Sequence, residues 1–392
     1  MTAFGQLAED PMSLIMIALA LLLLYLGIFK KYEPLLLIPI GFGVLLANFP
    51  GGNMNVVSTQ MVPDIKHMTL VEIADGYGIM NMLYYALIKT GLLPPLIFMG
   101  VGAMTDFGPL LRNLKLAFFG AAAQLGIFAV LTGAMLVGFS PKEAGALGII
   151  GGADGPTAIY TAIKLAPHLL GPIAIAAYSY MALVPVIIPL VVRFTVTKKE
   201  LKINMKQQDR DYPSNYKIKN LKLVKILFPI ALVIVISLIV PSATPLLGML
   251  LFGNLVKEIG TDTNRLFEAA SSTIMNTSTI FLGLTVGATM TSSTFLNTQT
   301  LMIIFGGFIA FAFSILGGIM AVKIHNLFSK KKINPLIGAT GLSAVPMASR
   351  VANEIALKED SSNHILQYAM SSNISGVIGS AVAAGILISF LG

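Results

Sequence analysis

The sequence contains no cysteine, only four histidines and few charged residues. The lack of cysteine excludes disulfides, thiolate metal sites and cysteine nucleophiles. The histidines do not pair at a metal-ligand spacing, which argues against a transition-metal site. Charged residues make up 11% of the chain, against about 25% in an ordinary soluble protein.

So little charge cannot cover the water-exposed surface of a 392-residue globule. Hydrophobic residues make up 55% of the chain, and the mean hydropathy is +0.82. The composition therefore predicts a polytopic membrane protein in contact with a lipid bilayer. It excludes a soluble enzyme, a disordered chain and a fibrous repeat. The net charge of +8 is interpreted as basic cytoplasmic loops, and we expect no nucleic acid partner.

Apolar spans interrupted by glycine and proline run along the chain. Several are shorter than the ~20 residues of a straight span, and irregular backbone is tolerated in a membrane only inside protein or beside a cavity. This pattern is typical of a transporter core. The expected spans cover approximately residues 12–29, 34–49, 92–104, 114–138, 171–192, 224–240, 244–256, 300–322 and 364–391.

One hydrophilic stretch divides the chain. Residues 193–225 contain ten Lys or Arg and three acidic residues. This predicts a cytoplasmic linker, which is solvated and compatible with docking of a soluble partner. We assign residues 1–192 to a first repeat, 193–223 to the basic cytoplasmic linker and 224–392 to a second repeat.

The two halves resemble each other in three blocks that keep their order. Chance similarity among apolar segments is the alternative, but the matching glycine and proline positions argue against it. The matched blocks are 34–48 with 244–258, 98–113 with 281–297, and 151–166 with 338–355.

The charges of corresponding loops indicate that the repeats are inverted. Lys30 and Lys31 follow the first span, whereas the counterpart loop at 241–244 is uncharged. Conversely, the loop 139–144 is nearly neutral, and its counterpart contains the lysines of 330–332. Inverted topology requires this reversal. It predicts that the N- and C-termini lie outside and the linker inside.

Residues 145–165 and 333–358 must each return to the face from which they came. We therefore expect two re-entrant hairpins, or pairs of half-helices, that enter from opposite faces and meet near the bilayer midplane. The predicted fold class is an all-α polytopic membrane protein with two inverted-topology repeats and opposed re-entrant hairpins. The outer spans are expected to form a scaffold, and the spans with the hairpins a mobile core.

The GGADGPT motif of the first hairpin contains Asp154, the only acidic residue between Glu143 and Glu200. A carboxylate at the membrane centre costs about 3 kcal/mol, so it is retained with a cation, a proton or a partner. Together with exposed glycine carbonyls it predicts an oxygen site for an alkali cation. The alternative is a helix N-cap in a surface loop. Nearby hydroxyls belong to Thr157, Tyr160, Thr161 and Tyr180.

The second hairpin differs chemically, because Thr340 stands at the repeat position of Asp154. Arg350 has five donors and can hold a carboxylate bidentately; the alternative is a charge that snorkels to the cytoplasmic interface. The last span contains consecutive polar residues that either join helices or ligate an ion, and both readings stay open. These residues are Ser371, Ser372 and Asn373.

These blocks resemble the β subunits of the biotin-dependent, sodium-translocating decarboxylases. That family comprises the membrane subunits of the oxaloacetate, methylmalonyl-CoA, glutaconyl-CoA and malonate decarboxylases. The resemblance covers essentially the whole chain and is carried by GIIGGADGPTAIYTA, INPLIGATGLSAVPMASRVAN and SSNISGVIGSAVAAG. It implies a carboxybiotin decarboxylase in a bacterial or archaeal cell (inner) membrane. Decarboxylation would drive Na⁺ outward and consume an external proton.

The resemblance also implies the cofactors and partners. Na⁺ and biotin are expected, the latter as carboxybiotin on the carrier domain of a partner. Further expected partners are a carboxyltransferase subunit, which selects the acid or acyl-CoA, and a small membrane subunit of the γ or δ type. A homo-oligomer is also expected.

Residue pattern and resemblance together give the candidate site. The catalytic candidates are Asp154, Tyr180 and Arg350. Sodium is expected at Asp154 and Asn373, with further ligands from Gly152, Thr157, Thr340 and Ser343. Carboxybiotin is expected to contact Arg350, Asn334, Ser343 and Gly338.

Architecture alone fits a second class equally well. In a secondary Na⁺-coupled carboxylate transporter or a Na⁺/H⁺ antiporter, Arg350 would bind a substrate carboxylate and Asp154 the coupling ion. A purely structural membrane scaffold would not need an acid between glycines at the midplane.

Overall fold

The computed structural model describes residues 11–31, 33–57, 61–213, 218–344 and 347–392. Within these ranges every regular element is a helix, as the sequence predicts. Five helical segments there are long and apolar enough to cross a membrane, and up to seven if each of two bent pairs counts as one span. The five are α2 (Pro11–Ile28), α8 with α9 (Leu114–Ala123 and Leu125–Leu136), α16 (Leu221–Ile239), α21 (Thr298–Phe328) and α24 (Leu366–Leu391).

The two bent pairs break where the sequence places prolines. In the first pair, α5 (Ile79–Leu83) and η2 (Tyr84–Ile88) meet α6 (Leu93–Met104) at 63°, and α6 has prolines in its first turn. In the second, η4 (Pro167–Leu169) and α12 (Leu170–Ala182) meet α13 (Val184–Thr195) at 68°, again with a proline at the start of the second helix. Proline is tolerated in a first turn but ends a preceding helix.

Large apolar side chains lie on the outer faces of the spanning helices. Leu238 is 79% exposed and Phe328 87% exposed. Such exposure is unfavourable in water and is expected where helices contact lipid. The chain is therefore a multi-pass membrane protein.

A helix outside the predicted spans packs closely on a predicted one, α3 (Pro34–Ala47). It is α19 (Met275–Ala288), which continues from α18 (Asn264–Glu268) through the π-helical turn η7 (Ala269–Ile274). Its sequence contains runs of serine and threonine, such as Ser271 to Thr273 and Thr277 to Thr279. Hydroxyl side chains in a helix can donate hydrogen bonds to its own carbonyl oxygens, as Thr279 does to that of Met275 over 2.7 Å. Because these serines and threonines interrupt the apolar sequence, the segment does not have the pattern of a membrane span.

Two helix crossings join the halves of the chain. The helix α3 (Pro34–Ala47) packs on α19, and α17 (Thr244–Ile259) packs on α6. Both crossings are closed by glycine: a Cβ on Gly287 would lie 2.3 Å from the Ile40 carbonyl oxygen, and one on Gly102 only 1.8 Å from that of Leu250. No larger residue fits at either place, as is usual where membrane helices approach closely.

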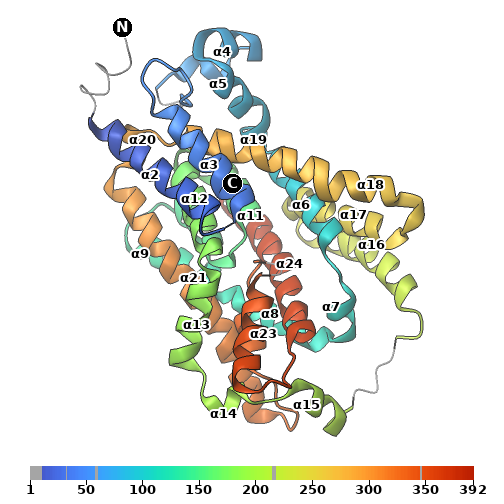
Figure 1. Ribbon diagram of the computed structural model, residues 1–392. Coiled ribbons are helices and arrows are strands. Elements are labelled where there is room, and N and C mark those ends of the chain that lie inside the picture. Colours follow the sequence, from blue (N-terminus) through green and yellow to red (C-terminus); the bar gives the residue numbers. More distant parts are fainter. Residues whose placement is uncertain (1–10, 32, 58–60, 214–217, 345–346) are drawn as a thin grey trace.

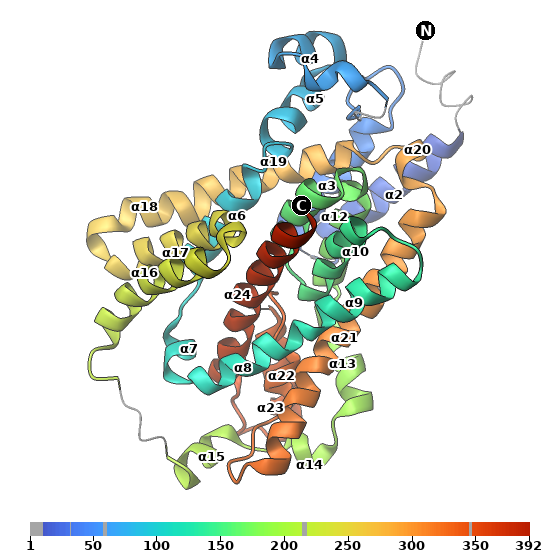
Figure 2. The same ribbon diagram turned by 180° about the vertical axis from the view of Figure 1, so that it is seen from behind.

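Each interval predicted to be a hairpin contains short helices separated by a break. The first has α10 (Pro141–Gly148), η3 (Ile149–Gly152) and α11 (Gly155–Leu165). The second has α22 (Leu336–Ala339) and α23 (Met347–Glu359), and residues 345–346 between them lie outside the described ranges. Both pack within a bundle formed by α8, α9, α21 and α24. Figures 1 and 2 show this bundle beside the group that contains α6, α16 and α17.

The linker also contains helices. In both views α14 (Lys198–Leu201) and α15 (Met205–Asp211) lie at one end of the molecule, near α23, and α4 (Leu70–Tyr77) lies at the opposite end (Figures 1 and 2). The remaining elements are η1 (Pro63–Lys66), α7 (Gly108–Arg112), η5 (Pro241–Ala243), η6 (Thr261–Thr263) and α20 (Ser292–Phe295).

Candidate functional site

Asp154 lies at the break of the first helix pair. The backbone turns left-handed at Ala153 (φ 54°) and is extended again at Asp154 (φ −125°, ψ 96°). Asp154 Oδ1 accepts a hydrogen bond from the backbone N–H of Thr157 over 3.1 Å, so Asp154 is the N-cap of α11. Its exposure is only 6%. The N-cap is therefore real, but it lies in the protein interior and not in a surface loop.

Two serines connect Asp154 to the second helix pair. The Ser380 hydroxyl of α24 donates to Asp154 Oδ2 over 2.8 Å, and Ser343 Oγ lies 2.8 Å from Ser380 Oγ. When Ser380 gives its proton to the carboxylate, Ser343 is the donor to Ser380. The Ser343 backbone N–H also donates to the Gly152 carbonyl oxygen over 3.0 Å. The two breaks thus meet around one carboxylate.

Asn373 fastens the second break to α24. Its Nδ2 donates to the carbonyl oxygens of Thr340, over 3.1 Å, and of Leu342. The Thr340 hydroxyl lies 3.0 Å from the Ala369 carbonyl oxygen. The nearby Ser371 hydroxyl donates to the Pro109 carbonyl oxygen over 2.7 Å. Of the two roles that the sequence left open, Ser371 joins helices, whereas Asn373 both joins segments and keeps a further oxygen.

Two of the expected sodium ligands have buried oxygens without a hydrogen-bond partner among the described residues. They are Thr157 Oγ1 and Asn373 Oδ1. A buried acceptor without a donor is unfavourable by about 1–3 kcal/mol, and such atoms are rare. A cation satisfies an acceptor as a donor does. Thr157 follows Asp154 in the first turn of α11, and Asn373 lies at the second break, so both oxygens are available as ligands near the meeting of the two breaks.

The tyrosine packed beside Asp154 is Tyr178. A Cβ on Gly155 would lie 2.0 Å from Tyr178 Cε1, and the Tyr178 hydroxyl is buried without a partner among the described residues. The Tyr180 hydroxyl instead donates to the Ile304 carbonyl oxygen of α21. Successive helical residues turn by about 100°, so these two tyrosines point to different sides of α12.

Arg350 and Gly338 lie on the second helix pair. Arg350 is exposed on α23, and no hydrogen bond or ion pair joins it to another described residue. The exposure agrees with the interfacial position that the sequence left as one alternative. Gly338 packs on α21, where a Cβ would lie 2.1 Å from the Gly318 carbonyl oxygen.

Asn334 holds the linker. Its side chain is fully buried, and Nδ2 donates to the carbonyl oxygens of Leu201 and Ile203 over 2.9 and 3.1 Å. Asn363 donates to the same two oxygens over 3.3 and 3.0 Å. Two buried amides thus clamp the turn between α14 and α15.

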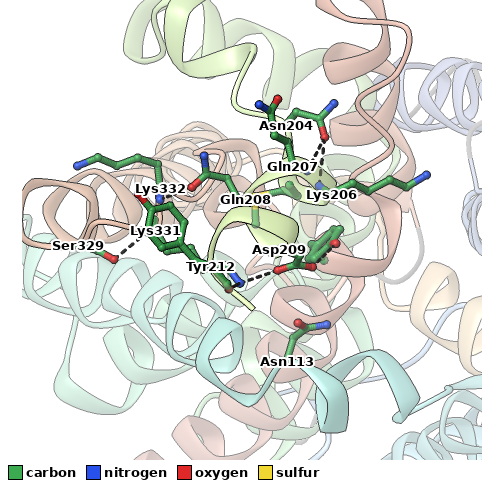
Figure 3. Close-up of polar contacts among 12 residues, drawn as sticks. Asn113, Asn204, Lys206, Gln207, Gln208, Asp209, Tyr212, Ser329, Lys331 and Lys332 are labelled. Carbon is green, nitrogen blue, oxygen red and sulfur yellow. Dashed lines mark hydrogen bonds and ion pairs between the residues drawn. The ribbon is translucent and has the colours of Figure 1, made fainter. Parts of the chain in front are cut away.

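Side-chain contacts extend this clamp (Figure 3). Asp209 of α15 accepts from Lys331 Nζ over 2.6 Å and from the Tyr368 hydroxyl over 2.5 Å. The Lys332 backbone N–H donates to Gln208 Oε1 over 2.8 Å. Residues 198–211 are therefore attached to the second helix pair and α24, and all of them except Leu201 and Met205 stay at least partly exposed.

Two acidic residues outside the spanning segments, Glu143 and Asp106, are bonded to cationic or polar neighbours. Burial acts to raise the pKa of Glu143, but hydrogen bonds from His168 and Ser140 outweigh it and lower the pKa to about 2. Burial likewise acts against ionisation of Asp106, but Lys225, 2.6 Å away, and the Gly108 N–H lower its pKa. Both acids are held as carboxylates.

The fold and site define a multi-pass membrane protein whose buried carboxylate lies where two broken helix pairs meet. Comparison with known families names this class. The chain belongs to the family described as Na⁺-transporting oxaloacetate decarboxylase β subunits, whose model matches residues 12–391. It is therefore the membrane subunit of a decarboxylase, and so an enzyme subunit, as the sequence resemblance implies.

Curated relatives match nearly the whole chain. Methylmalonyl-CoA decarboxylase subunit β of Propionigenium modestum is 47% identical over 390 residues, which are 97% of this chain and 95% of the relative. The protein of the same name from Veillonella parvula is 47% identical over 387 residues, covering 99% and 95%. The oxaloacetate decarboxylase β chain of Klebsiella pneumoniae is 44% identical over 420 residues, covering 96% and 94%.

Proposed function

We propose that this chain decarboxylates carboxybiotin and uses the free energy to move Na⁺ outward, with consumption of one external proton. The observation that carries the proposal is the chain of hydrogen bonds from Asp154 through Ser380 to Ser343. Asp154 is the one acid among the buried residues that the structure describes. Because Asp154 lies where the two helix pairs meet, movement of either pair would change the hydrogen bonds to its carboxylate.

Asp154 is the group at which Na⁺ and a proton exchange. A buried carboxylate is stable when it binds one cation or the other, so arrival of Na⁺ releases the proton toward the reaction. Asn373 and the backbone at Gly152 supply further oxygens. The same set includes the hydroxyls of Thr157, Thr340 and Ser343.

Arg350 receives the carboxylate of carboxybiotin, because its guanidinium is exposed and unpaired among the described residues and suits bidentate binding. Biotin on the partner's carrier supplies the carboxyl group. Ser343 is assigned both to the Na⁺ ligands and to the carboxybiotin contacts. Its hydroxyl lies within hydrogen-bond distance of the Ser380 hydroxyl, and it follows the turn at Gly338 in the chain. Asn334 contributes by holding the linker beside this turn.

Two tyrosines have separate roles in this scheme. Tyr180 supports the centre by fixing α12 to the Ile304 carbonyl oxygen of α21. Tyr178 lies at Gly155, and its free hydroxyl is suited to pass a proton to or from Asp154.

Inverted repeats account for the arrangement of the helices. Ile40 and Leu250 occupy the same place in the matched blocks 34–48 and 244–258, and each carbonyl oxygen faces a glycine of the other half, Gly287 and Gly102. The crossing of α3 on α19 thus has a counterpart, with the halves exchanged, in that of α17 on α6. With the reversed loop charges, this supports termini outside and the linker inside. The crossed helices would form the scaffold and the bundle around Asp154 the mobile core.

The partners follow from the family and the surface. A biotin carrier and a carboxyltransferase act from the cytoplasmic side, near α14, α15 and Arg350. A small γ- or δ-type membrane subunit completes the complex in the cell (inner) membrane, and the chain forms a homo-oligomer.

Reconstituted vesicles test the proposal against a secondary transporter. The complete enzyme is placed in proteoliposomes with a carboxylated biotin donor, and ²²Na⁺ movement and CO₂ release are followed together. We expect Na⁺ transport only while carboxybiotin is decarboxylated. Na⁺ movement driven by a carboxylate or proton gradient alone, without CO₂ release, would contradict the proposal and favour the symporter or antiporter.

A further inference from the structure

Gln124 lies inside the protein at the interruption between α8 and α9. It is 6% exposed, and the helix closes there with an i−3 hydrogen bond from its N–H to the Ala121 carbonyl oxygen over 3.1 Å. The flanking sequence, Gly120 to Ala123 and Leu125 to Gly126, offers no polar partner. A buried amide at the break of a membrane span needs an explanation.

Three carbonyl oxygens fix the orientation of this amide. Gln124 Nε2 donates to Gly120 O of its own helix over 3.1 Å, to Gly341 O of the second break over 3.2 Å, and to Gly376 O of α24 over 3.4 Å. Turning the amide over would place an acceptor oxygen against three acceptors. Oε1 therefore must point the other way.

Oε1 points into the Asp154 region. A Cβ on Gly152 would lie 3.5 Å from Gln124 Oε1 and 3.0 Å from Ser380 Cβ. The Gln124 Cγ lies against Gly379, where a Cβ would be 2.9 Å away. The oxygen is thus next to the residue two before Asp154 and beside the turn of α24 that carries the Asp154 donor.

This oxygen has no hydrogen-bond partner among the described residues, and its atom is buried. The Ser380 hydroxyl, on the adjacent turn of α24, is already placed to donate to Asp154 Oδ2. A buried carbonyl oxygen without a donor is unfavourable, and a cation held at the same break would satisfy it.

We propose that Gln124 Oε1 is a neutral oxygen ligand of the Na⁺ that Asp154 binds. The inference rests on the proposed function, since it adds a ligand to the same cation site. Because the Nε2 of this side chain is bonded to Gly341 and Gly376, the ion is linked directly to the second break and to α24. Gln124 thereby binds the ion and couples ion binding to the second break and α24, the segments that must move.

Equilibrium ²²Na⁺ binding to the purified full-length chain tests the proposal. Gln124→Met keeps the volume and removes the oxygen, and we expect Na⁺ affinity to fall about tenfold or more. Asn254→Leu is the matched control, because Asn254 is also a buried amide that donates to two carbonyls and has a free oxygen, but on the scaffold helix α17.

Thermal unfolding in K⁺ buffer separates a ligand from a structural part. A purely structural Gln124 would lower the unfolding midpoint in Gln124→Met and Asn254→Leu alike while leaving Na⁺ affinity at the wild-type value, and that result would overturn the proposal. The unmodified chain and Asp154→Asn are measured alongside. If the unmodified chain binds no Na⁺, the proposed function itself fails; if Asp154→Asn alone loses binding, only the role of Gln124 fails.

Discussion

The backbone N–H of Ser343 donates to the carbonyl oxygen of Gly152 over 3.0 Å, which joins the breaks of the two helix pairs by a main-chain hydrogen bond. The hydroxyl of the same serine reaches Ser380, the donor to Asp154. The second break therefore cannot shift without changing both the backbone before Asp154 and the donors to its carboxylate. In the proposed pump, this is how an event at the cytoplasmic side reaches the ion.

Ser380→Ala removes the hydroxyl that stabilises the ionised Asp154. Hydrogen bonds to charged groups contribute about 1.5–3 kcal/mol, so we expect the Na⁺ concentration for half-maximal decarboxylation to change at least tenfold. Ser375→Ala is the control on the same helix, because the Ser375 hydroxyl donates only to the Ala117 carbonyl oxygen. Equal Na⁺ dependence in the two variants would contradict the assigned role of Ser380.

Gly155→Ala pushes a methyl group into the ring of Tyr178, whose Cε1 would be 2.0 Å away. Overpacking of this kind costs about 1–3 kcal/mol, so we expect a lower unfolding midpoint and impaired Na⁺-dependent turnover. At Gly133 an added methyl group would meet no neighbouring atom of the described residues within 4 Å, and Gly133→Ala should leave both unchanged. Normal activity in Gly155→Ala would show that Tyr178 does not need its place beside Asp154.

Asn334→Leu releases the turn between α14 and α15 from a buried amide. We expect faster tryptic cleavage at Lys202 and Lys206 even when no substrate is present. Asn264→Leu, which removes an amide bonded to exposed Glu268, serves as the control. If cleavage is unchanged and only the apparent affinity for the carboxylated carrier falls, Asn334 acts on the ligand and not on the linker.

Protonation of Glu143 should loosen the contact between the start of α10 and the segments that carry His168 and Gln299. The folded-state pKa of Glu143 is lowered to about 2 from an ordinary 4.5. Its contribution to stability is therefore complete above pH 4.5 and is lost as the pH falls toward 2. Unfolding midpoints of wild type and Glu143→Gln should differ above pH 4.5 and converge below it. A constant difference across this range would contradict the prediction.

Sequence reasoning located the breaks but not all of their contacts. The GGADGPT motif revealed Asp154 because a lone acid among glycines in an apolar region has few explanations. The sequence does not single out Gln124 and Ser380, because the residues directly before and after each of them are apolar or glycine. Only the rotation and packing of that helix show which neighbour such a residue meets.

The tyrosines and the linker also make contacts that cannot be predicted from the sequence. Tyr178 and Tyr180 are two positions apart, and the sequence does not give the rotation of α12 that turns Tyr178 toward Gly155. The charges of the linker indicate its side of the membrane, but its attachment depends on amides far along the chain, Asn334 and Asn363. Contacts between residues so far apart in the chain leave no local pattern in the sequence.

The central claim is that Asp154 couples decarboxylation to Na⁺ transport. The most direct test is Asp154→Asn in the complete enzyme, reconstituted in vesicles, with ²²Na⁺ uptake and CO₂ release measured together. Asp262→Asn, at an exposed acid outside the bundle, is the matched control and should behave as wild type. The account predicts that Asp154→Asn loses both Na⁺ uptake and Na⁺-dependent decarboxylation; decarboxylation that still responds to Na⁺ in that variant would contradict it.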